Sequence, residues 1–447
     1  MNDQSPATLF TPPGKVSETR PYNPDPARGY TIPAHHYYDP AIYQEELDAI
    51  FYRSWLYVCH VEKVREPGDY VTTKIGDQSV FVIRGKDGLL RGFYNVCQHR
   101  GHELLKGSGS SKVITCPYHA WSYHADGQVR TARGCQDMVD FDKANFALKP
   151  VGVDMFCNML FVNLDPNASP VATQLDGLEE ELRRYCPTLD DLTHAETLLF
   201  DVKANWKNVV DNFVECYHCP IGHPAFVELV DMPTYRTNTH RLWSSHCGHA
   251  KSGENAAYKF EGSVEDTAFG AWWIWPDLTL VMNPGCPNLV VFRMKPGGPE
   301  LTNETLEFYL SAKTPSAVEQ ASIDYFRDTL NPEDLGLVES VQRGLHSRGY
   351  NQGRYVIDKD RTQNSEHGLH HFHTRVLEAL GRISRRADRK NRLIRPHSAA
   401  GAGSFVPLDA PAVYALVFAT NRTAGLHPTG MWPDAPKNVQ TRRLRNA

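Results

Sequence analysis

Two short segments of the sequence each contain one cysteine and one histidine close together. Cys97 and His99 are separated by one residue, and sixteen residues later Cys116 and His119 follow with two residues between them. Two thiolates and two imidazoles are the ligands of a [2Fe–2S] cluster in which two histidines replace two cysteines on one iron. A zinc site uses the same residue types, but zinc fingers favour paired cysteines followed by paired histidines. The spacing therefore favours the iron–sulfur cluster over zinc.

A second group of candidate metal ligands lies in residues 205–223. His218 and His223 are five residues apart, and on a straight helix residues at this spacing point about 140° away from each other. Both imidazoles can reach one metal only if the helix breaks between them, and Pro220 and Gly222 predict such a break. Two histidines and one distant carboxylate form the facial triad of non-haem iron(II) enzymes, which leaves coordination positions for dioxygen and water.

The two groups of candidate ligands fall into segments of different character. Short β-type runs separated by turns fill residues 69–162, which predicts a small antiparallel β domain around the first group. Helical periodicity and apolar strand-like runs alternate after about residue 170, so we expect an α+β pattern around the second group. The segments that we expect are an N-terminal arm at 1–40, the small β domain at 41–168, the larger domain at 169–381 and a basic, poorly packed tail at 382–447.

Composition and charge narrow the class of protein. Hydrophobic residues make up 41% and charged residues 22% of the 447 residues, a balance typical of a globular enzyme. The net charge of −5 gives no argument for a nucleic-acid partner. Residues 382–447 hold 12 of the 47 basic and 3 of the 52 acidic residues, so residues 1–381 carry 35 basic and 49 acidic residues and a charge of −14. Long apolar runs and a signal-peptide pattern are absent from the sequence, so we expect a cytoplasmic protein.

The motifs around these candidate ligands resemble those of one protein family. CQHRG and CPYHAW resemble the two cluster loops of the Rieske family, and NWK-x3-DN-x2-E-x-YH-x4-HP resembles the iron-binding signature of the Rieske non-haem iron oxygenases. The similarity covers about residues 40–380. It implies a catalytic (alpha) subunit in which a small antiparallel β Rieske [2Fe-2S] domain precedes a larger catalytic domain with an antiparallel sheet and helices, of helix-grip type. The cluster ligands that it implies are Cys97, His99, Cys116 and His119.

The same resemblance implies the ligands of a mononuclear iron(II). The histidine ligands are His218 and His223, and the third ligand in the family is an aspartate five residues before a glutamate in a late helical segment. Asp334 and Glu339 have this spacing. Asp334 is therefore the expected third ligand, in preference to a role as a helix N-cap.

Cys216 and Cys219 form a C-x2-C pair beside these histidines. Ten cysteines in a chain of this length without a signal peptide are better interpreted as thiols and metal ligands than as a disulfide framework. A second C-x2-C pair is absent from the sequence, so we interpret these two residues as packing residues.

Glu215 lies three residues before His218, so on a helix the two side chains are neighbours. In the family this position is usually aspartate, and it joins an iron-binding histidine to a cluster-binding histidine of the adjacent subunit in a head-to-tail trimer. The resemblance therefore implies that Glu215 links His218 to His119 of a neighbouring subunit. With glutamate at this position, the chain resembles the carnitine and glycine betaine monooxygenase group.

The implied reaction is activation of O2 at iron with electrons from the Rieske cluster. A dinucleotide-binding fingerprint and a plant-type cluster motif are absent from the sequence, so a separate NAD(P)H-dependent reductase is the expected partner. The resemblance favours a small quaternary ammonium or amine substrate, carnitine- or betaine-like, with hydroxylation leading to C–N cleavage or demethylation. The alternatives are an oxygenase for an aromatic acid or amine and, less favoured, a Rieske electron carrier. The aromatic run Trp272–Trp275 could bind a cation, but such a strand more often forms core.

Overall fold

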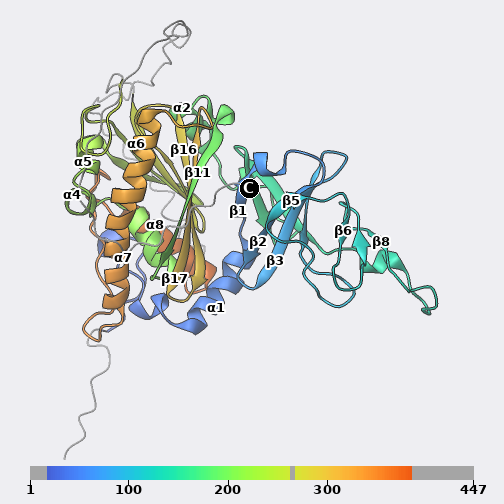
Figure 1. Ribbon diagram of the computed structural model, residues 1–447. Coiled ribbons are helices and arrows are strands. Elements are labelled where there is room, and N and C mark those ends of the chain that lie inside the picture. The colour runs from blue at the N-terminus through green and yellow to red at the C-terminus, as the bar shows by residue number, and fades with distance from the viewer. Residues whose placement is uncertain (1–17, 262–266, 385–447) are drawn as a thin grey trace, which may run out of the picture.

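The computed structural model describes residues 18–261 and 267–384, which form two units side by side (Figure 1). The first unit is built on a seven-stranded antiparallel sheet with the order β1-β10-β9-β4-β3-β2-β5, and the three-stranded sheet β6-β7-β8 extends from its outer end. Its strands are β1 (Leu56–His60), β2 (Asp69–Ile75), β3 (Gln78–Arg84), β4 (Leu90–Tyr94), β5 (Ser108–Ser110), β6 (Ile114–Thr115), β7 (Ser122–Tyr123), β8 (Val129–Thr131), β9 (Pro150–Phe156) and β10 (Met159–Asn163).

The second unit is built on another seven-stranded antiparallel sheet, in which β12 to β17 follow one another as a meander and β11 pairs with β17. Its strands are β11 (Thr193–Val202), β12 (Arg236–Thr239), β13 (Trp243–His249), β14 (Ala268–Ile274), β15 (Leu278–Met282), β16 (Asn288–Gly298) and β17 (Leu301–Leu310). The expected α+β organisation is confirmed.

Helices cover the second sheet. They are α1 (Pro40–Ala49), α2 (Leu178–Tyr185), α3 (Trp206–Phe213), α4 (Cys219–Gly222), α5 (Phe226–Leu229), α6 (Ala317–Tyr325), α7 (Asn331–Leu345) and α8 (His367–Ala379). A π-helical turn at Phe326–Leu330 joins α6 to α7, so the two form one long helical run (Figure 1). Such turns are frequent at functional sites. α3 packs against α7, β16 and β17, and these four elements surround the candidate iron ligands.

The tryptophans of β14 are core residues. Trp272 and Trp273 are fully buried and belong to different hydrophobic clusters, because neighbouring side chains of a strand point to opposite faces of the sheet. Trp273 packs against the ring of Phe372 of α8. The core interpretation of this aromatic run is therefore confirmed.

The described part of the expected arm lies against its own chain. Ile32, Ala34 and Tyr37 are buried in one cluster with Leu345 of α7. The backbone of the arm also bonds to residues 351–354, as in the bond of 3.0 Å from the Thr31 amide to the carbonyl of residue 353. A proline-rich segment makes few bonds within itself, so these contacts supply its partners. The expected tail lies outside the described residues from 385 onward.

A buried ion pair connects α1 with α3. Lys207 Nζ lies 2.6 Å from Glu46 Oε1, both side chains are inaccessible to solvent, and the Trp206 indole donates to the same carboxylate at 2.9 Å. A buried charge left without its partner is strongly destabilising. The pair therefore holds the start of the segment that continues to Glu215 and His218.

We expect Lys207→Met to lower the free energy of unfolding by about 3–5 kcal/mol, because Glu46 would keep a buried and unpaired carboxylate. Urea denaturation followed by circular dichroism measures this change. Lys203→Met, at an exposed position, is the matched control and should change stability by less than about 0.5 kcal/mol. An equal effect of both substitutions would contradict the role of the ion pair.

Candidate functional site

The side chains of His218, His223 and Asp334 converge at one point. The three ligand atoms lie within 4.8 Å of one another. His218 Nε2 is 3.1 Å from His223 Nε2, and Asp334 Oδ1 is 2.9 Å from His223 Nε2 and 3.7 Å from His218 Nε2. Ligands about 2.1 Å from one ion and 90° apart are about 3 Å from each other. The donor set and its spacing therefore fit one metal ion with open positions.

The local structure differs from the expected broken helix. α3 ends at Phe213, before the first histidine, and His218 precedes the short helix α4. Pro220 stands in the first turn of α4 and therefore helps to begin a helix instead of breaking one. His223 follows the last residue of α4, so one short helical turn brings the two imidazoles together. Asp334 lies within the first turn of α7, not at its N-cap.

Each of these histidines has a carboxylate on its other ring nitrogen. His218 Nδ1 hydrogen-bonds with Glu215, which also accepts from the backbone amides of Tyr217 and His218. The expected proximity of Glu215 and His218 is present, but a tight loop creates it instead of a helix face. His223 Nδ1 lies 2.8 Å from Glu333 Oε2. Such contacts fix the tautomer in which Nε2 carries the lone pair.

The carboxylates make this site favourable for positive charge. Burial disfavours protonation of His223, but the hydrogen bonds and charges of Asp334 and Glu333 outweigh burial and raise the pKa of this histidine to about 9. A metal cation at the convergence point would supply the same positive charge. The electrostatics and the donor atoms therefore favour the same kind of ligand.

A cavity of about 100 Å³ opens beside the three ligand side chains. Its wall is largely apolar and contains six aromatic residues: Phe213, Phe226, Tyr235, Phe269, Phe292 and Phe326. Among the described residues that form the wall, the acidic ones are Glu215, Glu304 and Asp334, and none is lysine or arginine. Trp272–Trp275 is not part of it. The cavity suits a compact, apolar or cationic molecule next to a metal.

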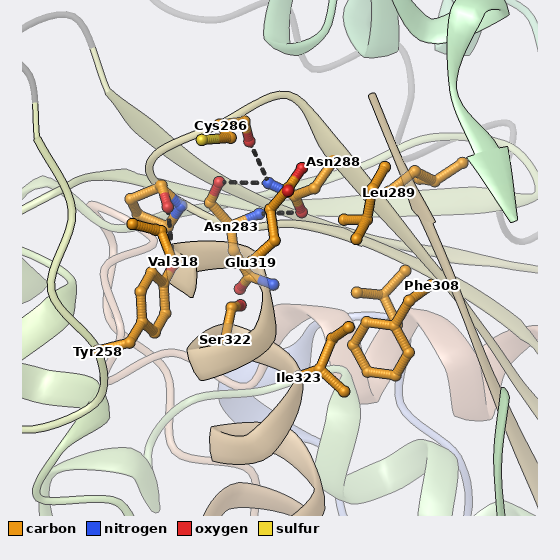
Figure 2. Close-up of a pocket in the computed structure, with 13 residues that line it drawn as sticks. Tyr258, Asn283, Cys286, Asn288, Leu289, Phe308, Val318, Glu319, Ser322 and Ile323 are labelled. Atoms are coloured by element: carbon orange, nitrogen blue, oxygen red, sulfur yellow. Dashed lines mark hydrogen bonds between the residues drawn. The ribbon is translucent and has the colours of Figure 1, made fainter. Parts of the chain in front are cut away.

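A smaller cavity of about 20 Å³ lies between α6 and the start of β16 (Figure 2). Its polar groups are largely satisfied within the protein: Asn283 and Asn288 bond to each other, and the Tyr258 hydroxyl donates to the carbonyl of Pro284 at 2.8 Å. The group of candidate metal ligands lies elsewhere. We assign no chemistry to this cavity.

The two Cys-His pairs lie on neighbouring loops of the first unit. Cys97 and Cys116 are both 2% exposed, and the Tyr123 hydroxyl lies 3.2 Å from Cys97 Sγ. The rings of His99 and His119 are 4.6 Å apart, and His99 stacks on Trp121. The structure therefore brings the four side chains together.

The donor atoms of this site fit a cluster. His119 Nδ1 is buried and makes no hydrogen bond within the described chain, although a buried polar nitrogen normally has a partner. Burial raises the pKa of Cys97, and the neighbouring Cys116 adds to this effect, whereas the Tyr123 hydroxyl opposes it. Two thiols crowded in this way and a nitrogen lacking a partner are the features of residues that bind a cluster.

The two candidate centres lie far apart within one chain. The loops around β6 and β8 are at one end of the molecule, whereas α4 and α7 are on the opposite side of the second unit (Figure 1). Tyr118, beside the Cys-His loops, is 54% exposed, and on the other face Tyr217 is 49% and Ile221 is 90% exposed. The two groups of candidate ligands are therefore separate sites within one chain.

Cys216 and Cys219 form a disulfide, so their interpretation as packing thiols was wrong; the turn before α4 brings their side chains together. His373 of α8 is buried and bonds to Asp211 at 2.9 Å and Tyr355 at 2.7 Å, so its ring nitrogens are used within the core. Sequence reasoning missed Glu333 and Glu304. Glu333 could have been found from its position beside Asp334.

Comparisons with known proteins place the chain among oxygenases. The family described as "Rieske [2Fe-2S] domain" matches residues 54–142, and "Ring hydroxylating alpha subunit (catalytic domain)" matches residues 189–382. The carnitine monooxygenase oxygenase subunit of Acinetobacter baumannii is 41% identical over 366 residues, which are 81% of this chain and 98% of that protein. Over the described residues, no helix is both long and apolar enough to cross a membrane.

Solved structures of a quaternary ammonium Rieske monooxygenase are also similar. The complex with L-carnitine has a TM-score of 0.73 and 38% identity, covering 81% of this chain and 99% of that chain. The complex with gamma-butyrobetaine has a TM-score of 0.72 and 39% identity, covering 79% of this chain and 97% of that chain.

Proposed function

Because the chain belongs to the Rieske non-haem iron oxygenases, as a catalytic (alpha) subunit, we propose that it is a monooxygenase for a small quaternary ammonium compound, carnitine- or betaine-like. The observation that carries this proposal is the aromatic, apolar cavity beside the triad of ligand side chains. A quaternary ammonium group offers no hydrogen-bond donor, so aromatic faces and negative charge are what recognise it. The complexes of the related monooxygenase with L-carnitine and gamma-butyrobetaine support the same substrate class.

The cofactors are a Rieske [2Fe-2S] cluster and a mononuclear iron. When bound, the cluster supplies electrons and the iron activates O2. We assign the cluster to two cysteines and two histidines: Cys97, His99, Cys116 and His119. We assign the iron to His218, His223 and Asp334.

The protein side chains position and shield the substrate. The aromatic wall would hold the ammonium group and exclude water, while Glu215 and Glu333 keep the ligand histidines in one tautomer. Hydroxylation of a carbon bonded to nitrogen gives a product that breaks down to an amine and an aldehyde. The reaction is therefore C–N cleavage or demethylation.

We propose that the protein forms a head-to-tail homotrimer, and the separation of the two centres within one chain supports this proposal. The exposed side chains of Tyr217, Ile221, Leu337 and Val341 form an apolar surface near the iron site, and Tyr118 is exposed beside the cluster site. Contact between these two surfaces of adjacent subunits would bring the His119 of one subunit toward the Glu215 of the next. We further propose that a separate NAD(P)H-dependent reductase supplies electrons, and that the protein works in the cytoplasm.

Product analysis tests the proposed function. We expect purified protein to hold about three irons per chain and, with a reductase, NADH and O2, to release trimethylamine or formaldehyde from carnitine or a betaine. NADH consumption without product does not count, because peroxide release mimics it. Hydroxylated aromatic acids as the only products would establish the alternative substrate class, and about two irons per chain would indicate an electron carrier.

A further inference from the structure

Glu304 places a carboxylate inside the apolar core. It lies on β17, is 4% exposed and forms part of the cavity wall. Its neighbours on the adjacent strands are Met294 of β16 and Phe200 of β11, and Leu306, two residues further along the same face, is fully buried. A carboxylate in such surroundings carries a large desolvation cost unless a partner compensates it.

The described residues offer Glu304 only a neutral partner. Asn331 Nδ2 donates to Glu304 Oε2 at 3.2 Å, whereas no ion pair to this carboxylate occurs in the described ranges. Two other buried glutamates have cations: Glu307, three residues along the same strand, pairs with Lys63 Nζ at 2.8 Å, and Glu46 pairs with Lys207. Glu304 therefore has the environment of a carboxylate whose cation comes from outside the protein.

In the absence of a cation, the surroundings of Glu304 favour its protonated, neutral form. Burial raises the pKa of Glu304 to about 8; the Asn331 amide opposes the rise and the charge of Asp334 adds to it. A cation bound in the cavity would offset both the desolvation and the repulsion. The cavity wall itself, as far as the chain is described, contains no lysine or arginine that could do so.

Glu304 is close enough to the triad to orient a substrate. Its partner Asn331 lies three residues before Asp334 in the first turn of α7, and residues at this spacing are neighbours on one helix face. Glu304 is not part of the group of three ligand atoms. A charged group held by Glu304 would thus lie about one helical turn from the ligand carboxylate.

We propose that Glu304 is the specificity-determining residue of the cavity and supplies the negative charge that holds a quaternary ammonium head, with the aromatic wall around it. This inference rests on the proposed function and extends it. Glu304 would recognise the positive charge of the ligand, so the cavity should bind a neutral molecule of the same shape more weakly. Because the methyl groups of the head would then face the triad, the carbons bonded to nitrogen become the ones within reach.

Two ligands of equal shape test the proposal. Gamma-butyrobetaine carries a trimethylammonium head, and in 5,5-dimethylhexanoate carbon replaces its nitrogen. Calorimetric titration of the iron-loaded, full-length protein measures both dissociation constants. We expect the wild type to bind gamma-butyrobetaine more tightly by roughly tenfold or more, and Glu304→Gln to lose this preference through weaker binding of the cation alone. Glu304→Asp, which keeps the charge, should retain part of it.

Iron content and melting temperature verify that each variant is folded and loaded. Glu307→Gln removes the other buried carboxylate of β17, outside the cavity, and should leave the preference unchanged. If Glu304→Gln keeps the wild-type preference while the wild type turns over gamma-butyrobetaine, the role of Glu304 is wrong and the proposed function stands. If the wild type binds both ligands equally and turns over no quaternary ammonium compound, both proposals are overturned.

Discussion

We expect Glu215→Ala to lower turnover by at least about 100-fold while both metal centres remain bound. This factor is the upper end of the range for loss of a group that orients a metal ligand. Glu215 contacts His218 and is not among the three converging ligand atoms, so its loss should not release the iron. It is the group on the cluster-facing side of His218 in the proposed trimer. Stopped-flow reduction of the cluster, product formation and iron content, measured on the same preparation, test this expectation.

Glu333 provides the matched control for Glu215. It makes the same kind of contact with the other histidine, at 2.8 Å from His223 Nδ1, but it is not proposed to face a neighbouring subunit. If Glu215 connects two subunits, Glu333→Ala should reduce turnover clearly less than Glu215→Ala. Equal losses would mean that both residues only orient imidazoles, and normal product formation by fully metallated Glu215→Ala would refute the bridging role.

We expect Asp334→Ala to remove the mononuclear iron and to leave the cluster in place. The substitution removes one of the three ligand atoms and also a negative charge that favours a cation beside His223. Iron affinity should therefore fall by more than about 10- to 100-fold, the loss typical when a residue that only supports a ligand is removed. Iron should decrease from about three to about two per chain, because Cys97 and Cys116 lie in the other unit.

Asp328→Ala is the control for this substitution. Asp328 is an exposed carboxylate of the π-helical turn that precedes α7, and its ion pair is with Arg327. Its loss should leave three irons and normal turnover. Retention of the third iron by Asp334→Ala, measured by metal analysis together with the unchanged cluster absorption, would show that Asp334 is not a ligand.

Local motifs made part of the site predictable. Cys97 and His99 share one loop, as do Cys116 and His119, so the sequence spacing itself sets how their donor atoms approach. The β character of residues 69–162 likewise follows from short-range alternation. The family resemblance then indicated Asp334, which no local pattern connects to His218.

Other parts of the site depend on contacts between distant segments. The sequence pattern predicts a helix that includes Glu215, but α3 ends at Phe213, and the carboxylate of Glu215 accepts from the amides of Tyr217 and His218 in the loop that follows. Glu333 reaches His223 only because α7 packs beside α4. The disulfide between Cys216 and Cys219 depends on the same turn.

The sequence by itself indicated the side chains that we propose as metal ligands: residue type and short spacing indicated the cysteines and histidines, and the family resemblance indicated Asp334. The tertiary structure alone decided what surrounds them. Glu304 is one acidic residue in a strand, and nothing in its spacing distinguishes it from Glu307. The register of β17 turns one toward Lys63 and the other into an aromatic cavity. Burial and the presence or absence of a counter-charge arise from packing between segments far apart in the chain, and they distinguish the carboxylate that we propose as the cation site from its paired neighbour.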